Sequence, residues 1–162
     1  MKIRIIALAQ TFLVLTFLSV LPGTGVAQEY SSKRAESCLG CHRTAKWQVM
    51  AIFNTKHGSQ TDPDAPFSNL QCEACHGPSQ DHRKAKDKAE VQPTRTFGKG
   101  DSAPVSDQNG ACLSCHEAHT GAGWFGSRHE SVDVACVSCH TIHADRDPMF
   151  DPIEQQETCF TC

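Results

Sequence analysis

Apolar residues are distributed unevenly along this chain. Residues 5–21 form one long apolar stretch, which follows Lys2 and Arg4 and is followed by small residues up to Ala27. Beyond that point the aromatic residues are scattered rather than arranged in periodic stripes, and no segment keeps a helical or alternating period. The chain therefore divides into an apolar leader, residues 1–27, and a segment, residues 28–162, with little material for an ordinary hydrophobic core.

A few elements are predicted within residues 28–162. Residues 45–54 could form a short helix with Trp47, Met50 and Phe53 on one side, and residues 82–90 another with a charged surface. Glycine and proline predict loops at residues 93–109 and 120–126. We expect a mostly irregular chain with a few short helices and little or no sheet.

The leader is typical of a secretory signal peptide, with a positive start, an apolar stretch and cleavage after Ala27. An uncleaved membrane anchor is the alternative, since about 20 apolar residues span a bilayer. Pro22, Gly23 and Gly25 interrupt the stretch and favour cleavage. Loss of Lys2 and Arg4 would change the net charge from −3 to −5, which argues against a nucleic-acid-binding protein. The mixed charges at residues 82–88 are typical of a solvated face.

The cysteines supply the clearest repeat. All ten belong to Cys-x-x-Cys pairs: Cys38/Cys41, Cys72/Cys75, Cys112/Cys115, Cys136/Cys139 and Cys159/Cys162. Successive pairs are 34, 40, 24 and 23 residues apart, too uneven for a solenoid of equal structural units. What repeats is a chemical attachment point.

A histidine follows each of the first four pairs directly: His42, His76, His116 and His140. This is the attachment signature of haem c. The two thiols can form thioethers with the two vinyl groups on one porphyrin edge, and the adjacent imidazole can ligate the iron. Disulfides, zinc sites and a thioredoxin-like redox pair are alternatives, but none explains four adjacent histidines. We therefore predict haem c at four complete motifs.

The fifth pair stops at Cys162, where a histidine should follow. We expect that the sequence ends inside a fifth motif and that the native protein continues with a histidine. A terminal thiol pair without haem is the alternative.

Five histidines lie outside the motifs: His57, His82, His119, His129 and His143. A lone histidine is often an ordinary surface or core residue, but here their number nearly matches the number of haems. A second imidazole on each iron would leave no open position for a substrate, so such haems pass electrons. Porphyrins would also fill the interior and pack edge to edge, and their propionates would add negative charge that steers the protein toward basic patches on partners.

Several segments resemble a known family beyond the haem motifs. They are residues 70–78 (LQCEACHGP), 96–99 (TFGK) and 134–140 (VACVSCH), followed by His143 and Asp147-Pro148. Over residues 37–162 the chain resembles the first half of the periplasmic decahaem cytochromes of the MtrA/DmsE type. The resemblance implies an elongated chain that holds a staggered row of bis-histidine haems. It also implies a periplasmic protein inside an outer-membrane β-barrel porin, which carries electrons between periplasmic cytochromes and an extracellular cytochrome in extracellular respiration or in iron oxidation.

By position, the resemblance implies that His57, His82, His129 and His143 are distal ligands, whereas His119 matches no family position. Five motifs instead of ten imply a truncated sequence or a genuine pentahaem relative. The leading hypothesis is an electron carrier that is not an enzyme. The alternative is a multihaem reductase of a nitrogen or sulfur oxyanion, which needs an iron with an open position. A redox sensor would need a fused signalling domain.

Overall fold

The structure is a computed structural model that describes residues 28–44, 48–98, 103–118 and 123–162. The predicted signal peptide, residues 1–27, lies outside these ranges, as does His119. None of the helices described is both long and apolar enough to cross a bilayer.

Short helices joined by irregular chain make up the fold, and the described residues contain no β-strand. The α labels denote α-helices and the η labels 3-10 helices. In chain order they are α1 (Arg34–His42), η1 (Val49–Asn54), η2 (Lys56–Gly58), α2 (Pro66–Asn69), α3 (Cys72–His76), α4 (Gln80–Lys84), α5 (Val105–His116), α6 (Arg128–Ser131), η4 (Cys136–Ser138), η5 (Pro148–Phe150) and α7 (Pro152–Cys159). The predicted class, mostly irregular with short helices, is confirmed.

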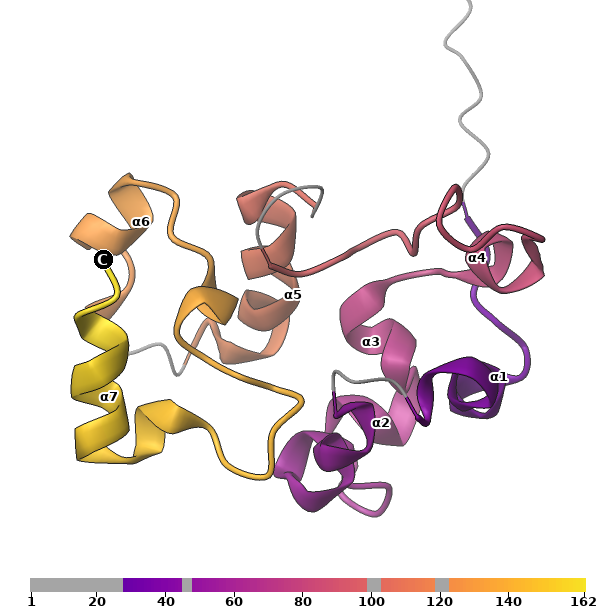
Figure 1. Ribbon diagram of the computed structural model, residues 1–162, viewed down its shortest axis with the longest axis horizontal. Coiled ribbons are helices and arrows are strands. Elements are labelled where there is room, and N and C mark those ends of the chain that lie inside the picture. The colour runs from indigo at the N-terminus through magenta and orange to yellow at the C-terminus, as the bar shows by residue number, and fades with distance from the viewer. Residues whose placement is uncertain (1–27, 45–47, 99–102, 119–122) are drawn as a thin grey trace, which may run out of the picture.

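Helices α1 and α4 lie at one end of the long axis and α6 and α7 at the other, and the chain passes through α2 and α3 before it returns to the first end at α4 (Figure 1). Neighbouring elements pack in an order close to that of the sequence. Helix α3 contacts both α1 and α5, α5 contacts η4, and α7 packs on η5. A row of sites that follows the chain can therefore extend from end to end.

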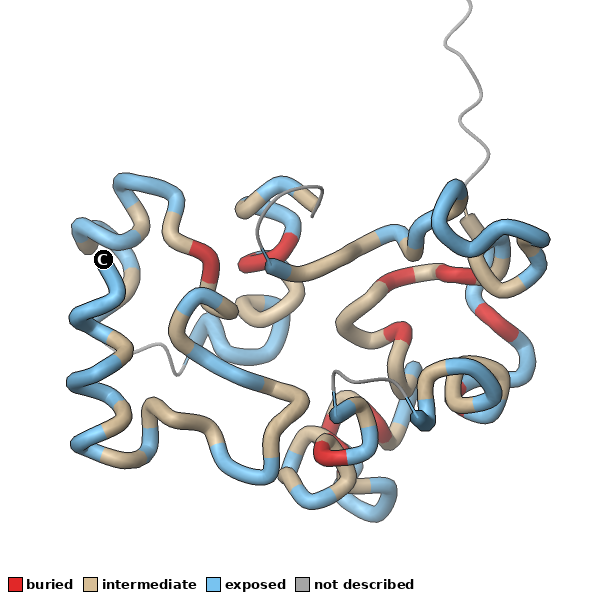
Figure 2. The backbone as a smooth tube through the Cα atoms, viewed as in Figure 1, coloured by how far each residue is buried: buried red, intermediate tan, exposed pale blue. Residues whose placement is uncertain are grey.

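Little apolar side chain is buried. Among the described residues, the buried apolar ones are Phe67 and four alanines, Ala35, Ala51, Ala65 and Ala135, and Figure 2 shows their buried positions in short, separated stretches. Phe67 meets Phe53 edge to face at 4.9 Å between ring centroids. In contrast, Phe150, Ile153 and Phe160 are 81%, 71% and 78% exposed. As the sequence indicated, the polypeptide alone forms only a meagre core.

Buried polar side chains join the segments instead. Glu73 is 4% exposed, and its carboxylate accepts hydrogen bonds from the backbone N–H of Ser31 at 2.9 and 3.0 Å and of Ser79 at 2.8 Å. The amide of Asn109 accepts from Cys136 N–H at 2.8 Å and donates to Val134 O at 3.0 Å. Because each such group is satisfied by its partners, burial is tolerated.

Two element predictions were wrong in extent. The helix expected over residues 82–90 is α4 (Gln80–Lys84), which ends where Ala85 becomes extended. The chain then turns back so that Val91 O approaches the His82 ring. The loop expected over residues 93–109 gives way to α5, because Pro104 directly precedes that helix as its N-cap residue, and Gln108 and Asn109 are buried by their hydrogen bonds.

The helix expected over residues 45–54 is described only in part. Residues 45–47, with Trp47, lie outside the described ranges, and the remainder forms the 3-10 helix η1. Residues 120–122 of the second predicted loop also lie outside them, and residues 124–126 form bends and turns.

Candidate haem-binding site

Each complete Cys-x-x-Cys-His motif forms about one helical turn. Helices α1, α3 and α5 each end at the histidine of their motif. In the fourth motif, η4 covers Cys136–Ser138, and His140 N–H donates to Cys136 O at 2.9 Å. Positions i, i+3 and i+4 of such a turn share one face. The two thiols and the imidazole can therefore reach one porphyrin from the same side.

The end of α3 shows how the chain holds one histidine in place. Gly77 ends the helix at φ 70°, and a Cβ there would lie 3.1 Å from the Cβ of Thr94. This left-handed conformation and the close approach both favour glycine. The chain then returns, so that Arg95 N–H donates to His76 O at 2.9 Å and the His76 ring nitrogen Nδ1 lies 3.1 Å from Arg95 O.

Three histidines of the motifs each face one histidine from a remote segment. The ring centroids of His42 and His82 are 6.2 Å apart, those of His76 and His143 are 6.3 Å apart, and those of His116 and His57 are 5.9 Å apart. Up to 67 residues separate the partners, since His76 and His143 are that far apart in the sequence. The fold thus pairs motif histidines with three of the predicted distal histidines.

These separations fit a single metal ion between each pair of rings. A metal–imidazole nitrogen bond is about 2.0–2.1 Å and the ring centre lies about 1.1 Å behind that nitrogen, so two opposed ligands have centres about 6.3 Å apart. Two of the pairs lie within 0.1 Å of that separation and the third within about 0.4 Å. With two thiols beside one ring of each pair, the donor set fits haem c.

Backbone carbonyls orient several of these rings. Nδ1 of His82 lies 2.6 Å from Val91 O, Nδ1 of His143 lies 3.3 Å from Val49 O, and His76 uses Arg95 O as described above. In the tautomer that carries its proton on Nδ1, each ring donates to that carbonyl and leaves Nε2 for a metal. Ligating histidines are held in this way in many metal sites.

The environment favours the neutral imidazole, which is the form that binds metal. Burial lowers the pKa of His42, and the facing His82 lowers it further. Burial, followed by the facing His116, lowers the pKa of His57. Burial also lowers the pKa of His76, against the effect of its hydrogen bond to Arg95 O.

Cysteines of successive motifs lie close together in sequence order. A hydrogen bond with Cys72 lowers the pKa of the Cys38 thiol to about 7 and raises that of Cys72. A hydrogen bond with Cys112 likewise lowers the pKa of Cys136 to about 7. The first motif therefore meets the second, and the third meets the fourth.

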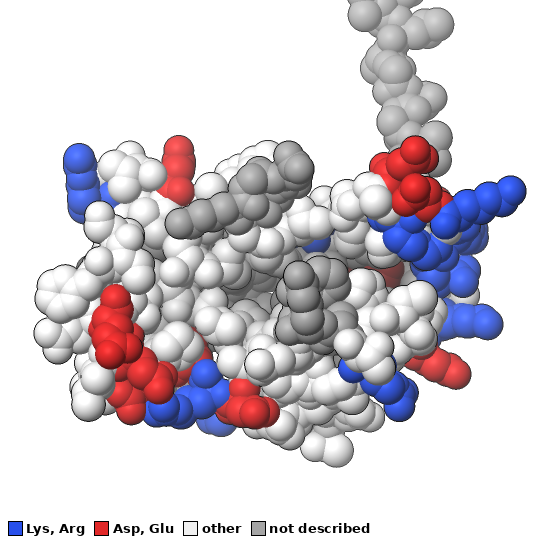
Figure 3. Space-filling model, in the orientation of Figure 1, with Lys and Arg blue, Asp and Glu red and all other residues white. Residues whose placement is uncertain are grey.

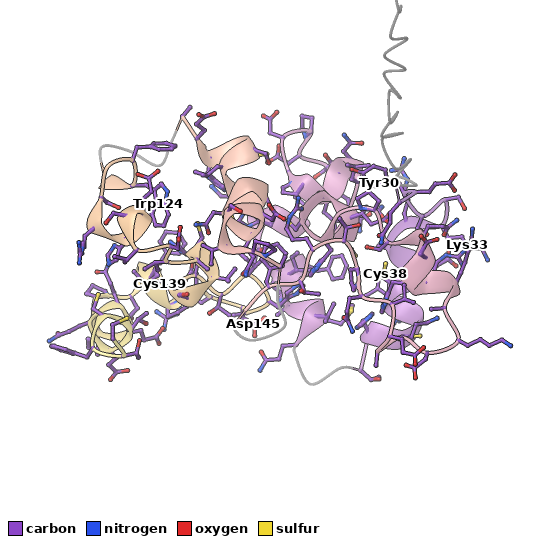
Figure 4. All side chains as sticks on the ribbon, turned by 90° about the horizontal axis from the view of Figure 1, so that it is seen from above. Tyr30, Lys33, Cys38, Trp124, Cys139 and Asp145 are labelled. Atoms are coloured by element: carbon purple, nitrogen blue, oxygen red, sulfur yellow. The ribbon has the colours of Figure 1, made fainter. Side chains whose placement is uncertain are left out.

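The remaining two junctions follow the same order. Burial raises the pKa of Cys75, while Arg95 opposes this shift and Cys115 of the third motif adds to it. Burial raises the pKa of Cys139, and Cys159 and Cys162 of the fifth pair add to the shift. Figure 4 shows Cys38 and Cys139 toward opposite ends of the molecule. The attachment points thus form one row from the first pair to the fifth.

The fourth motif differs from the other three. Nδ1 of His140 lies 2.7 Å from the carboxylate oxygen Oδ2 of Asp147, and no second histidine ring among the described residues faces His140. His129, predicted as a distal ligand, lies exposed on α6, and His119 is outside the described residues. The structure therefore does not bring a described histidine to this site.

Some residues around the site were not predicted from the sequence. The carboxylate of Glu73, the guanidinium of Arg95 and the carboxylate of Asp147 all contact motif residues or their neighbours. Only Asp147 had a local signal, because Asp followed by Pro is typical of a helix start.

Two sequence families match the chain. The family described as "Cytochrome c-type protein NrfB-like" matches residues 72–162, more than half of the chain, and "Cytochrome c554 and c-prime" matches residues 23–77. Between them they cover all five cysteine pairs. A curated relative, "Multiheme cytochrome MtrA" of Shewanella baltica (strain OS185), is 41% identical over 133 residues, which are 82% of this chain and 38% of that protein. The chain thus spans well under half the length of this relative. Together with the paired histidines and the repeated attachment motif, these matches establish that the chain belongs to the multihaem c-type cytochromes.

Proposed function

We propose that this chain passes electrons along a row of covalently bound haems and works as part of a conduit across the outer membrane. The observation that carries the proposal is that cysteines of successive motifs lie near one another in sequence order. They are hydrogen-bonded between the first and second motifs and between the third and fourth, and they lie within electrostatic range of each other at the other two junctions. Porphyrins tethered at neighbouring cysteines have edges close to one another. An electron can then move from one to the next without any moving part.

The residues that would attach the porphyrins through thioether bonds are the ten cysteines Cys38, Cys41, Cys72, Cys75, Cys112, Cys115, Cys136, Cys139, Cys159 and Cys162. The histidine pairs that would hold the irons are His42 with His82, His76 with His143, and His116 with His57. An iron with two imidazole ligands has no open position, which favours electron transfer over catalysis. His140 ligates the fourth haem, with His129 or His119 as candidates for its other face.

Export and the partners complete the proposal. Cleavage of residues 1–27 would release the protein into the periplasm. The resemblance to the periplasmic decahaem cytochromes of the MtrA/DmsE type, a name that the curated relative shares, is the basis for placing the chain beside a β-barrel porin, between periplasmic cytochromes and an extracellular cytochrome. Sequencing the amino terminus of the purified protein tests the export step, since a start at Gln28 is expected and a start at Met1 would contradict it.

The conduit itself can be tested in vesicles that carry the haem-loaded protein, expressed with the porin gene, in their membranes. With a reduced viologen inside, addition of an impermeant ferric chelate outside should oxidise the viologen. The matched variant is Cys112→Ala/Cys115→Ala, which removes the haem in the middle of the row and leaves both ends. Transfer that is equally fast in this variant would contradict a path through the row.

The reductase hypothesis is favoured by one observation, the lack of a facing histidine at His140 among the described residues. If that iron has an open position, the reduced protein binds one carbon monoxide per chain and is oxidised by nitrite or a sulfur oxyanion with turnover. No binding and no turnover would exclude this function.

A further inference from the structure

The ring of His140 is held by a charged group, whereas backbone carbonyls hold the rings of His76, His82 and His143. We propose that Asp147 lowers the reduction potential of the haem at the fourth motif through its hydrogen bond with His140. The inference rests on the proposed attachment of haem at Cys136 and Cys139. It assigns to Asp147 a positioning and tuning role, exerted through the histidine.

Asp147 is fixed in place by its own local structure. It precedes η5, and its oxygen Oδ1 accepts a hydrogen bond from Met149 N–H at 3.1 Å, so that the other oxygen, Oδ2, faces His140 at 2.7 Å. Its side chain is 14% exposed, compared with 48% for His140. The carboxylate is therefore the more buried and more constrained partner of the two.

Asp147 does not form an ion pair with the neighbouring Arg146. The guanidinium of Arg146 instead contacts Asp151 at 2.9 Å and Glu154 at 2.5 Å. The carboxylate of Asp147 is thus left to act on the ring of His140, which it contacts directly, and it acts through space on His57, which faces His116 of the third motif. Its negative charge sits on the side of the ring opposite to Nε2, the nitrogen available for iron.

The direction of the effect follows from ligand chemistry. A carboxylate that accepts the Nδ1 proton makes the imidazole a more electron-rich ligand. Such a ligand stabilises ferric more than ferrous iron, so it lowers the potential. Reduction adds one electron to the ferric ion and breaks no bond, because the proton remains between Nδ1 and Oδ2. A backbone carbonyl has no net charge and exerts a weaker effect.

The size of the effect can be bounded. Hydrogen bonds to an ionised acceptor are roughly twice as strong as those between neutral groups. We expect Asp147→Asn to raise the equilibrium constant for reduction of one haem by about threefold to tenfold, which for a one-electron couple is roughly 30 to 60 mV. The amide keeps an oxygen acceptor for Met149 N–H, so the start of η5 is retained.

The test is a potentiometric titration of the haem-loaded protein, followed by optical and low-temperature electron paramagnetic resonance spectra. The haem at the fourth motif should show the largest shift to higher potential in Asp147→Asn, with altered g values of its low-spin ferric signal, whereas the haem at the third motif, whose partner His57 only feels Asp147 through space, should shift less. Asp147→Glu, which keeps the charge, should retain most of the low potential. The matched control is Asp145→Asn, because Asp145 is a nearby acid whose Oδ1 contacts Asn54 Nδ2 at 2.7 Å and no histidine.

Equal shifts in Asp147→Asn and Asp145→Asn would overturn the inference, since they would show a general charge effect, and so would no shift at all. If Asp147→Asn fails to mature, Asp147→Ser keeps a capping hydroxyl for Met149 N–H and tests the same loss of charge. A preparation without haem at the fourth motif would instead refute the proposed function. The mass of the chain distinguishes the two failures.

Discussion

The pairing of remote histidines can be tested one haem at a time. The change is His57→Gln, His82→Gln or His143→Gln, each of which removes the ring that faces one motif histidine. Because the facing rings lie within about 0.4 Å of the separation expected for two ligands on one iron, each variant should open one axial position. We expect one high-spin haem and one additional carbon monoxide bound per reduced chain, measured by optical titration.

A second mutation identifies the partner in each pair. Cys112→Ala/Cys115→Ala removes the haem of the third motif, whose His116 faces His57. In that background His57→Gln should add no further carbon monoxide binding, whereas His82→Gln should still add one equivalent. The pairing would be refuted if His57→Gln and His82→Gln altered the spectrum of the same haem. It would also be refuted if His57→Gln still added carbon monoxide binding in the protein that lacks the third haem.

Three further predictions concern the protein around the haems. Glu73→Gln should lower the stability of the haem-loaded protein by about 2 kcal/mol, because it removes a buried carboxylate that accepts hydrogen bonds from two backbone N–H groups, those of Ser31 and Ser79. Thermal unfolding measures this loss, and the exposed control Glu36→Gln should change stability little. The exposed lysines Lys84, Lys86 and Lys88 lie beside His82 at the basic end of the molecule (Figure 3). Replacing all three by Glu should slow reduction by an acidic flavodoxin at least about tenfold at low salt and much less at high salt. Equal reduction rates of the variant and the unaltered protein in stopped-flow measurements would contradict electrostatic steering. The hydrogen bond from Arg146, and then those from backbone N–H groups, hold the pKa of Asp151 below its ordinary value of 3.8. The stability that ionised Asp151 contributes to α7 is therefore present above that pH and is lost as pH falls through the lower pKa of the folded protein. Far-ultraviolet circular dichroism should show a change at low pH that Asp151→Asn removes.

The attachment chemistry could be predicted from the sequence because it is local. Two cysteines and a histidine in one turn are specified by five adjacent residues, and the lack of apolar periodicity already indicated a small core. The same locality explains the correct fold class, since short helices around each motif need no long-range pairing. Family matches to residues 23–77 and 72–162 agree with this part of the prediction.

The histidine pairs could not be predicted from spacing. His76 and His143 meet only because α3 and the chain after η4 are brought together by packing, and no period in the sequence records that contact. The ends of α4 and α5 were misjudged for a related reason. The turn back at Ala85 serves a hydrogen bond between Val91 and His82, and the start of α5 depends on buried amides of Gln108 and Asn109, whose partners lie elsewhere in the chain.

Haem attachment at the cysteine pairs is tested most directly by the mass of the intact denatured protein, purified from a host that attaches haem c. The sequence contains four complete motifs and a fifth cysteine pair, so the mass should exceed that of the processed polypeptide by four or five covalently bound haems. A mass equal to that of the bare polypeptide would show that no haem is attached to the cysteine pairs and would contradict the assignment of this chain as a haem-based electron carrier.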